Sequence, residues 1–511
     1  MVATDPRPAR GIREKTGYIL ALPLFLLVLF AIELPGLSIE GHRVLAVAAM
    51  MALLWTTEAI PIPVTALMPL VLFPVLNVSA FGKVAQSYAH SNVFLFMGGF
   101  FIAIAMQKWH LHRRIALHLI LRIGGSPGRL VLGFMVATAF LSMWISNTAT
   151  ALMMFPIGLA IVVHLEEKNR AEKHAIMRFR VALMLAIAYS ASVGGIGTLI
   201  GTPPNIVFSS SVAALYPQAP PIGFAQWLIP GLLLVMIFLP VIWLILTRLM
   251  FPMQDNLAGG GRAIIREEIN KLGPMTREER LVSAVFVLTA LAWITRGDLL
   301  LGNMFIEGWA SRLGLASTVN DATVAMGAAV VLFLLPAGSN TAHFLLEWRD
   351  ADKIPWGILL LFGGGIALAA GFKTSGLAEW IGGQLHLFAS VPVPVMILLI
   401  CLTLTFLTEV TSNTATSTLF MPILASTATG IGVHPFLLMI PATISASCAF
   451  MLPVATPPNA IIFGSGYISI PDMVKTGFLL NLAGVVLVTL ITWYVVIPVF
   501  GITAGIPAWA R

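Results

Sequence analysis

The chain has 511 residues, of which 58% are hydrophobic and only 10% are charged. Soluble globular domains carry about 25% charged residues, so a shortage over the whole length excludes a soluble protein built around one core. The net charge of +7 comes from short basic clusters between apolar runs. Such clusters are typical of membrane topology signals rather than of a nucleic-acid-binding surface. The composition predicts an all-α polytopic membrane protein.

The chain starts with a basic segment and then a first apolar run, which we interpret as a cytoplasmic N-terminus and first transmembrane helix at 1–42. No A-x-A cleavage site follows the run, so we expect a retained helix rather than a signal peptide. A span needs about 20 apolar residues, and the shorter runs here need help from neighbouring helices. The candidate spans lie near 17–34, 43–57, 64–78, 92–107, 181–215, 227–250, 281–295, 320–336, 354–371, 436–465 and 475–500.

The segment at about 130–164 does not fit this pattern. Leu130 to Leu141 is a short apolar run, and it is followed by a polar group around Ser146-Asn147-Thr148 and then by a second apolar arm. Neither arm spans the ~30 Å of hydrocarbon comfortably. Two short arms around a polar tip predict a re-entrant hairpin whose tip lines a cavity or is buried in protein. The alternative is two ordinary helices joined by Ser, Thr and Asn contacts.

Three landmarks of the chain recur in the same order. The offsets between the copies are 266, 265 and 254 residues, which indicates an internal duplication after one leading helix. The second polar tip lies inside a second predicted hairpin at about 391–429. The paired segments are SNTAT at 146–150 and 412–416, FMGGFF at 96–101 with LFGGGI at 361–366, and GTPPNIVF at 201–208 with ATPPNAII at 455–462.

The duplication sets the expected domain organisation. Five crossings in each copy require the second copy to lie inverted, and the basic loops of the first copy correspond to nearly uncharged loops in the second. We therefore expect an inverted-repeat transporter with about 11 transmembrane helices and two re-entrant hairpins, its N-terminus cytoplasmic and its C-terminus outside. The expected units are repeat 1 at 43–250 with a broken helix at 201–205, a cytoplasmic linker at 251–280, repeat 2 at 281–500 with a broken helix at 455–459, and a C-terminal tail at 501–511.

The polar tips can hold both a cation and an anion. Ser and Thr hydroxyls and the Asn carbonyl are neutral oxygen ligands, while Asn amide and hydroxyl hydrogens can bind a carboxylate. Carbonyls before each Pro-Pro pair lose their helical partners, and the restarting helix presents its positive end. Neither tip nor break contains Lys or Arg, so bound cations would neutralise an anion, which favours sodium co-transport over an anion channel. Glu409 either orients the second tip or titrates.

The paired S-N-T-A-T tips and T-P-P-N breaks, with WTTEAIPIPVTALMPL at 55–70, resemble the divalent anion/sodium symporter family over nearly the whole chain. The resemblance implies a homodimer in which each protomer has a scaffold domain and a transport domain. It also implies an elevator-type motion that carries sodium and substrate together. The family's substrates are C4-dicarboxylates, citrate and, in some members, sulfate. An enzyme is not expected.

The resemblance further implies particular binding residues. Sodium site 1 would use Ser142, Ser146, Asn147 and a carbonyl near Gly201, for which Gly197 is an alternative. Sodium site 2 would use Thr408, Ser412, Asn413 and the carbonyl of Ala455. The substrate carboxylates would meet Asn147, Thr148, Asn413 and Thr414, near Pro457.

These observations lead to one functional hypothesis with an alternative. We expect a multi-pass protein of a bacterial inner membrane, embedded in membrane lipid, that transports succinate, malate or fumarate together with sodium ions. The alternative is an obligate dicarboxylate exchanger, or a sulfate or citrate carrier, on the same fold. No spacing in the chain distinguishes these substrates or gives the sodium stoichiometry, and we expect no nucleic-acid partner.

Overall fold

The computed structural model describes residues 11–168, 172–253, 261–301, 304–338, 342–384 and 391–511. Helices make up nearly all the regular structure of these residues, and two three-residue strands, β1 (Leu299–Leu301) and β2 (Met304–Ile306), form one antiparallel pair. The predicted all-α polytopic fold is confirmed. Parts of the predicted N-terminus (1–10) and of the predicted linker (254–260) lie outside the described residues. So do 169–171 of the basic loop of the first copy, which we place at 165–180, and 385–388 of its weakly charged counterpart, which we place at 373–388.

Local sequence explains where the first helices begin and end. The Ser38 hydroxyl accepts a hydrogen bond from the backbone N–H of Gly41, 2.9 Å away, and so caps α2. Glu58 ends the same helix in the left-handed conformation, with φ of 52°, just before the prolines of the next segment. The bounds are α1 (Ile12–Phe30), α2 (Ile39–Thr57), α3 (Ile62–Ala66), α4 (Met68–Val75), α5 (Phe81–Tyr88), α6 (Ser91–Lys108) and α7 (Leu111–Ile123).

The next group contains a helical hairpin and a broken helix. Four residues, 143–146, join the two arms of the hairpin, and a non-helical segment at 197–202 precedes the Pro203-Pro204 pair. Proline suits the first turn of a helix because it has no N–H to leave unpaired. The bounds are α8 (Pro127–Ser142), α9 (Asn147–Lys168), α10 (Lys173–Ile196), α11 (Pro203–Leu215), α12 (Phe224–Leu244), the π-helical turn η1 (Ile245–Met250) and α13 (Gly261–Leu272).

The second half repeats this order. Five residues, 408–412, join the arms of a second helical hairpin, and a longer non-helical segment at 446–456 precedes Pro457-Pro458. The bounds are α14 (Arg277–Arg296), α15 (Trp309–Arg312), α16 (Asp321–Leu334), η2 (Trp348–Lys353), α17 (Trp356–Thr374), α18 (Leu377–Gln384), α19 (Val393–Leu407), α20 (Asn413–Gly430), α21 (Phe436–Ser445), α22 (Pro457–Phe463), α23 (Ile470–Ile491), η4 (Thr492–Val496), α24 (Ile497–Val499) and η5 (Ala508–Ala510).

Seven stretches of the described chain are helical, long and apolar enough to cross a membrane. Shorter apolar helices accompany them and include one arm of each hairpin. The other arm of the first hairpin is one of the seven long stretches, so the expectation that neither of its arms is long enough to span is wrong for that arm. The long stretches are Ile39–Thr57, Phe81–Lys108, Asn147–Glu167, Lys173–Ile196, Phe224–Met250, Trp356–Thr374 and Ile470–Val499. The shorter helices are Ile62–Val75, Pro127–Ser142, Asp321–Leu334, Val393–Leu407 and Phe436–Ser445.

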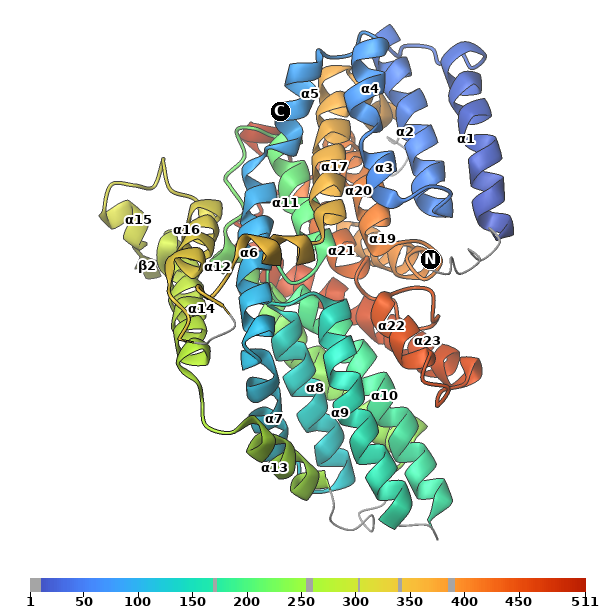
Figure 1. The fold of residues 1–511 in the computed structure, drawn as a ribbon. Helices are drawn as coiled ribbons and strands as arrows, with labels where there is room; N and C mark the ends of the chain where they lie inside the picture. The colour runs from blue at the N-terminus through green and yellow to red at the C-terminus, as the bar shows by residue number, and fades with distance from the viewer. Residues whose placement is uncertain (1–10, 169–171, 254–260, 302–303, 339–341, 385–390) are drawn as a thin grey trace, which may run out of the picture.

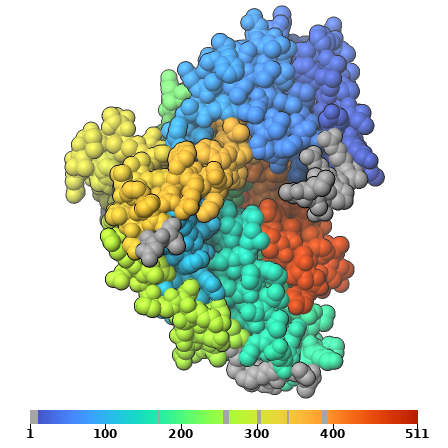
Figure 2. Space-filling model, in the orientation of Figure 1, coloured from blue at the N-terminus to red at the C-terminus, as the bar shows by residue number. Residues whose placement is uncertain are grey.

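The helices form two packed groups around the middle of the molecule. In Figure 1, α1 to α5 and α17 occupy the upper end, while α8, α9 and α10 occupy the lower end; α8 and α9 both pack on α10. The same division is visible on the surface in Figure 2, where the blue N-terminal residues cover one end and the teal residues of α8–α10 the other. Helix α11 packs on α17 and α20.

Candidate functional site

The turn of the first hairpin brings three oxygen atoms together. Ser142 Oγ lies 2.6 Å from Asn147 Oδ1 and 2.7 Å from the carbonyl oxygen of Ala191 on α10. A hydroxyl has one hydrogen to donate, so it can satisfy only one of these two acceptors. The cluster is therefore rich in oxygen and short of hydrogen, which is what a hard cation requires of its ligands.

The turn of the second hairpin repeats this arrangement. Thr408 Oγ1 lies 2.7 Å from Asn413 Oδ1 and 3.0 Å from the carbonyl oxygen of Ala446. Both hydroxyl-bearing residues, Ser142 and Thr408, are fully buried behind their tips. Each copy of the polar tip thus forms a similar three-oxygen cluster with one backbone carbonyl, which comes from within α10 in the first copy and from the start of the 446–456 segment in the second.

The T-P-P-N breaks are held by their own asparagines. Asn205 Nδ2 donates to the carbonyl oxygens of Gly195, Ile196 and Thr198 at 3.3, 3.4 and 2.7 Å. In the second copy, Asn459 Nδ2 donates to two carbonyl oxygens, each 3.1 Å away, those of Ala449 and Leu452. Five carbonyls in and before the breaks thus accept hydrogen bonds from the Asn side chain of their own motif, and the carbonyls predicted as sodium ligands, those of Gly201 and Ala455, are not among them.

One cavity of about 560 Å³ lies between the two tips and the two breaks. All five predicted substrate-binding residues line it. Six further residues were predicted only as sodium ligands, and four of these line the cavity as well. Ser142 and Thr408 lie behind it, and Gly197 is not among its lining residues. The predicted residues on its wall are Ser146, Asn147, Thr148, Gly201, Ser412, Asn413, Thr414, Ala455 and Pro457.

Three helix N-termini contribute positive partial charge to the cavity wall. Helices α9 and α20 begin at Asn147 and Asn413, and α11 begins at Pro203, and each of these first residues lines the cavity. A helix N-terminus carries a partial charge of about +0.5 and unpaired N–H groups, so it attracts anions. None of the residues on the cavity wall is Lys or Arg. The positive partial charge on this wall therefore comes from helix N-termini and not from basic side chains.

The wall also contains residues that sequence reasoning missed. Glu58, at the end of α2, is an exposed carboxylate on the cavity wall, and Phe96 and Phe100 of α6 contribute aromatic surface. Glu58 was detectable as the one charge in the WTTEAIP stretch, and the phenylalanines belong to the repeated FMGGFF landmark. Gly195 was also missed: a Cβ there would lie 2.5 Å from Asn147 Oδ1, so only glycine lets that amide approach the break.

Glu409 is buried and holds the second break in place. Its carboxylate accepts hydrogen bonds from the backbone N–H groups of Phe450, Met451 and Leu452 at 2.7–3.0 Å, and from the side-chain amide of Asn481 at 2.8 Å. A carboxylate with four donors needs no proton to satisfy its oxygens. Of the two roles considered for Glu409, these contacts support orientation.

Residues 13–500 match the family model described as the sodium:sulfate symporter transmembrane region. The chain belongs to this family. Its members are membrane transporters, so the chain is a transporter and not an enzyme. This agrees with the family resemblance found in the motifs.

Two curated relatives match this chain over almost its full length. It is 44% identical over 500 residues to a protein of Staphylococcus saprophyticus named sodium-dependent dicarboxylate transporter SdcS, covering 97% of this chain and 94% of the relative. The protein of the same name from Staphylococcus aureus is 44% identical over 494 residues, covering 96% of this chain and 93% of the relative.

Solved structures of transporters share the fold at low sequence identity. The Alcanivorax borkumensis YdaH transporter aligns with a TM-score of 0.54 and 12% identity, over 82% of this chain and 88% of its own. Neisseria gonorrhoeae MtrF, from a class of antimetabolite efflux pumps, aligns with a TM-score of 0.59 and 11% identity, over 97% of each chain. These similarities concern the fold alone.

Proposed function

We propose that this chain is a sodium-coupled symporter of divalent anions, with C4-dicarboxylates such as succinate, malate and fumarate as its substrates. The observation that carries the proposal is the pair of matching three-oxygen clusters, at Ser142–Asn147 and Thr408–Asn413, on two sides of one cavity. The relatives named as sodium-dependent dicarboxylate transporters support the same assignment.

Sodium as the coupling ion is supported by the chemistry of the clusters. Their ligands are hydroxyl, amide and backbone carbonyl oxygens, which suit a hard monovalent cation and cannot carry a proton at neutral pH. We assign site 1 to Ser142, Ser146, Asn147 and Gly201, and site 2 to Thr408, Ser412, Asn413 and Ala455. Gly201 is preferred to Gly197 because it lines the cavity.

A dicarboxylate is supported by the two-ended cavity. One end carries the donors of Asn147 and Thr148, and the other carries those of Asn413 and Thr414, with Pro457 beside them. Each tip offers amide and hydroxyl hydrogens together with a helix N-terminus, which is the environment that a carboxylate prefers. A four-carbon dianion has one carboxylate for each tip.

The transport cycle that we propose is an elevator motion within a homodimer of a bacterial inner membrane. The cavity wall combines α2, α3, α6 and α17 with the hairpins and breaks, and a division of this kind suits a scaffold and a moving unit. The inverted duplication, with the N-terminus cytoplasmic and the C-terminus outside, supplies the two alternating conformations.

The test is uptake of labelled succinate into proteoliposomes that contain the purified protein and no internal substrate. We expect concentrative uptake under an inward sodium gradient and none when choline replaces sodium. Uptake only when dicarboxylate is loaded inside would instead identify an obligate exchanger. A panel of labelled malate, fumarate, citrate and sulfate then tests the C4 assignment, because preference for citrate or sulfate would overturn it.

A further inference from the structure

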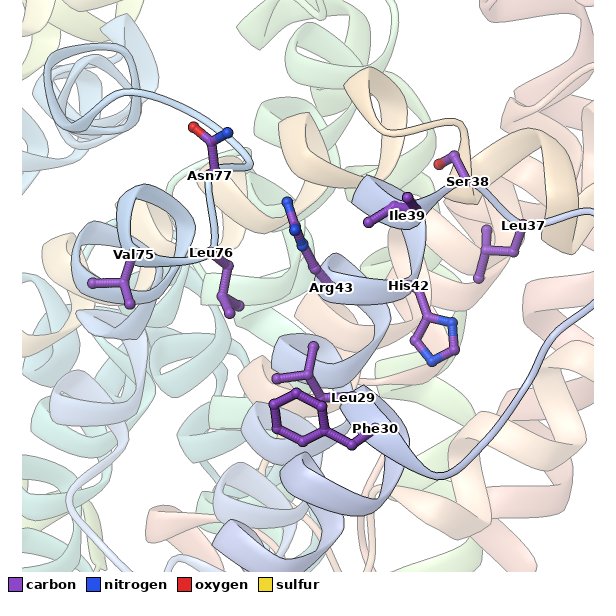
Figure 3. A pocket seen from close by; sticks show the side chains of 10 residues that line it. All are labelled: Leu29, Phe30, Leu37, Ser38, Ile39, His42, Arg43, Val75, Leu76 and Asn77. Atoms are coloured by element: carbon purple, nitrogen blue, oxygen red, sulfur yellow. The ribbon is translucent and has the colours of Figure 1, made fainter.

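A second pocket of about 480 Å³ lies away from the transport cavity, where α1 ends, α2 begins and α4 ends. Figure 3 shows Arg43 reaching from α2 toward the segment that carries Leu76 and Asn77, with Leu29 and Phe30 on α1 on the other side. The ends of a membrane-spanning helix, such as the start of α2, lie near the interface where lipid headgroups are found.

Arg43 is the exceptional cation of the described chain. Six of the described Lys and Arg residues are partly buried, and five of them form an ion pair with a carboxylate. No such partner is found for Arg43 within the described residues. A partly buried charge without a counter-ion is costly, so an external anion is the expected partner. The five paired residues are Lys108, Arg113, Arg114, Arg180 and Arg296.

Two of the other polar side chains of the pocket already contact backbone carbonyls of the protein, and one does not. Ser38 Oγ donates to the carbonyl oxygen of Ser375 at 2.6 Å, and a ring nitrogen of His42 contacts the carbonyl oxygen of Val28, so both hold the pocket wall together. Asn77 is exposed and lies in a left-handed turn with φ of 54°. Its side-chain amide makes no hydrogen bond to another of the described residues. Arg43 and Asn77 therefore remain to bind an anion.

The rim of the pocket is apolar and faces outward. Phe30, Val75 and Ile39 are 79%, 75% and 69% exposed, values that suit contact with acyl chains rather than with water. In Figure 1, α1 lies at the edge of the molecule and packs on α2, so the pocket opens at the periphery. An anion site that is bordered by exposed apolar side chains at helix ends matches an amphipathic ligand.

We propose that this pocket binds the headgroup phosphate of an anionic glycerophospholipid, with Arg43 as the cationic contact and Asn77 as a further donor. The acyl chains lie against Phe30, Val75 and Ile39. Arginine suits this role because its planar guanidinium can donate two hydrogen bonds to one phosphate. The proposal concerns a lipid site on α1, α2 and α4, and it does not depend on which anion the protein transports.

The test uses the delipidated full-length protein in detergent and measures its apparent Tm during titration with lipid. Phosphatidylglycerol and phosphatidylcholine of identical acyl chains separate charge from hydrophobic contact, and glycerol 3-phosphate separates a lipid from a soluble anion. We expect phosphatidylglycerol to stabilise the protein at lower concentration than phosphatidylcholine. Arg43→Gln should raise the half-saturating phosphatidylglycerol concentration by about fivefold, the effect of one basic residue at an anionic surface.

Two further variants complete the test. Lys83→Gln removes an exposed cation from α5, outside the pocket, and should keep the wild-type preference for phosphatidylglycerol over phosphatidylcholine. Arg43→Lys keeps the positive charge but lacks the planar guanidinium with its paired donors. Its preference for phosphatidylglycerol over phosphatidylcholine should therefore fall between those of the wild type and Arg43→Gln. This variant also serves as the test if Arg43→Gln fails to fold. Equal stabilisation of the wild type by both lipids, an unchanged preference in Arg43→Gln, or equal stabilisation by glycerol 3-phosphate would overturn the proposal.

Discussion

Asn481 donates its side-chain amide hydrogen to the Glu409 carboxylate at 2.8 Å, and this contact joins α23 to the turn of the second hairpin. Because Glu409 also accepts three consecutive backbone N–H groups of the 446–456 break, it connects the tip, the break and α23 at one point. The first copy has no carboxylate here: the backbone carbonyl of Met143 accepts a hydrogen bond from Thr198 instead. The two halves reach similar geometry by different contacts.

Replacing Glu409 tests whether it orients the break. In Glu409→Gln the amide NH₂ faces donors, so at least one buried hydrogen bond is lost, and we expect the free energy of unfolding to fall by about 1–3 kcal/mol. Uptake should fall with it, while the pH dependence of the remaining uptake stays that of the wild type. Glu33→Gln, an exposed carboxylate of the α1–α2 connection, is the control. Loss of pH dependence in Glu409→Gln with full stability would instead identify a titrating role.

The two tip asparagines should be equally necessary. Asn147→Ala and Asn413→Ala each remove one oxygen of a three-oxygen cluster and one amide that faces the cavity. We expect each to reduce sodium-driven uptake by roughly a hundredfold, since both an ion ligand and a substrate donor are lost. Asn270→Ala, an exposed position on α13, controls for substitution as such, and size-exclusion profiles check folding. Full uptake by either tip variant would remove that tip from the site.

The buried hydroxyls behind the tips separate sodium binding from substrate binding. Thr408→Val keeps the shape of the side chain but removes Oγ1, and Ser142→Ala removes Oγ in the first copy. We expect the half-saturating sodium concentration for uptake to rise roughly tenfold in each, whereas the KM for succinate at saturating sodium changes little. Thr408→Ser retains the hydroxyl and should behave like the wild type. A rise in succinate KM with unchanged sodium dependence would contradict these assignments.

The sequence was sufficient to indicate which residues share the cavity, because a rare polar motif repeated in an apolar chain leaves few places for its members to lie. Asn147 and Asn413 are 266 residues apart, yet both line one cavity. Oxygen chemistry and the duplication carried that inference, and neither depends on exact helix bounds.

The partners of the breaks could not be predicted in the same way. The Asn205 amide could face the substrate or its own backbone, and the choice depends on the direction of a side chain within an irregular segment. No periodicity in the sequence predicts that direction. The four donors to Glu409 come from residues 41 to 72 positions later, and Phe96 and Phe100 reach the cavity only through the packing of α6. Such contacts are set by tertiary structure rather than by local pattern.

Gly195 gives the sharpest test of how closely the first tip must approach its break. An added Cβ would lie 2.5 Å from Asn147 Oδ1, which is closer than real Cβ contacts come, and 3.0 Å from its Nδ2, so the carboxamide must move. Because the displaced Oδ1 can no longer lie beside Ser142 Oγ, we expect Gly195→Ala to reduce uptake by roughly tenfold to a hundredfold and to raise the sodium requirement. The measurement is initial-rate uptake against sodium concentration.

Gly327→Ala is the matched control for that variant. Gly327 lies within α16, and a Cβ there has nothing within 4 Å, so the substitution adds the same methyl group without a collision. Alanine is also the better helix former, by about 1 kcal/mol, so this variant should be as stable as the wild type or more so. Normal sodium dependence in Gly195→Ala would mean that Asn147 is not held against the break during transport, and the first sodium site would need other ligands.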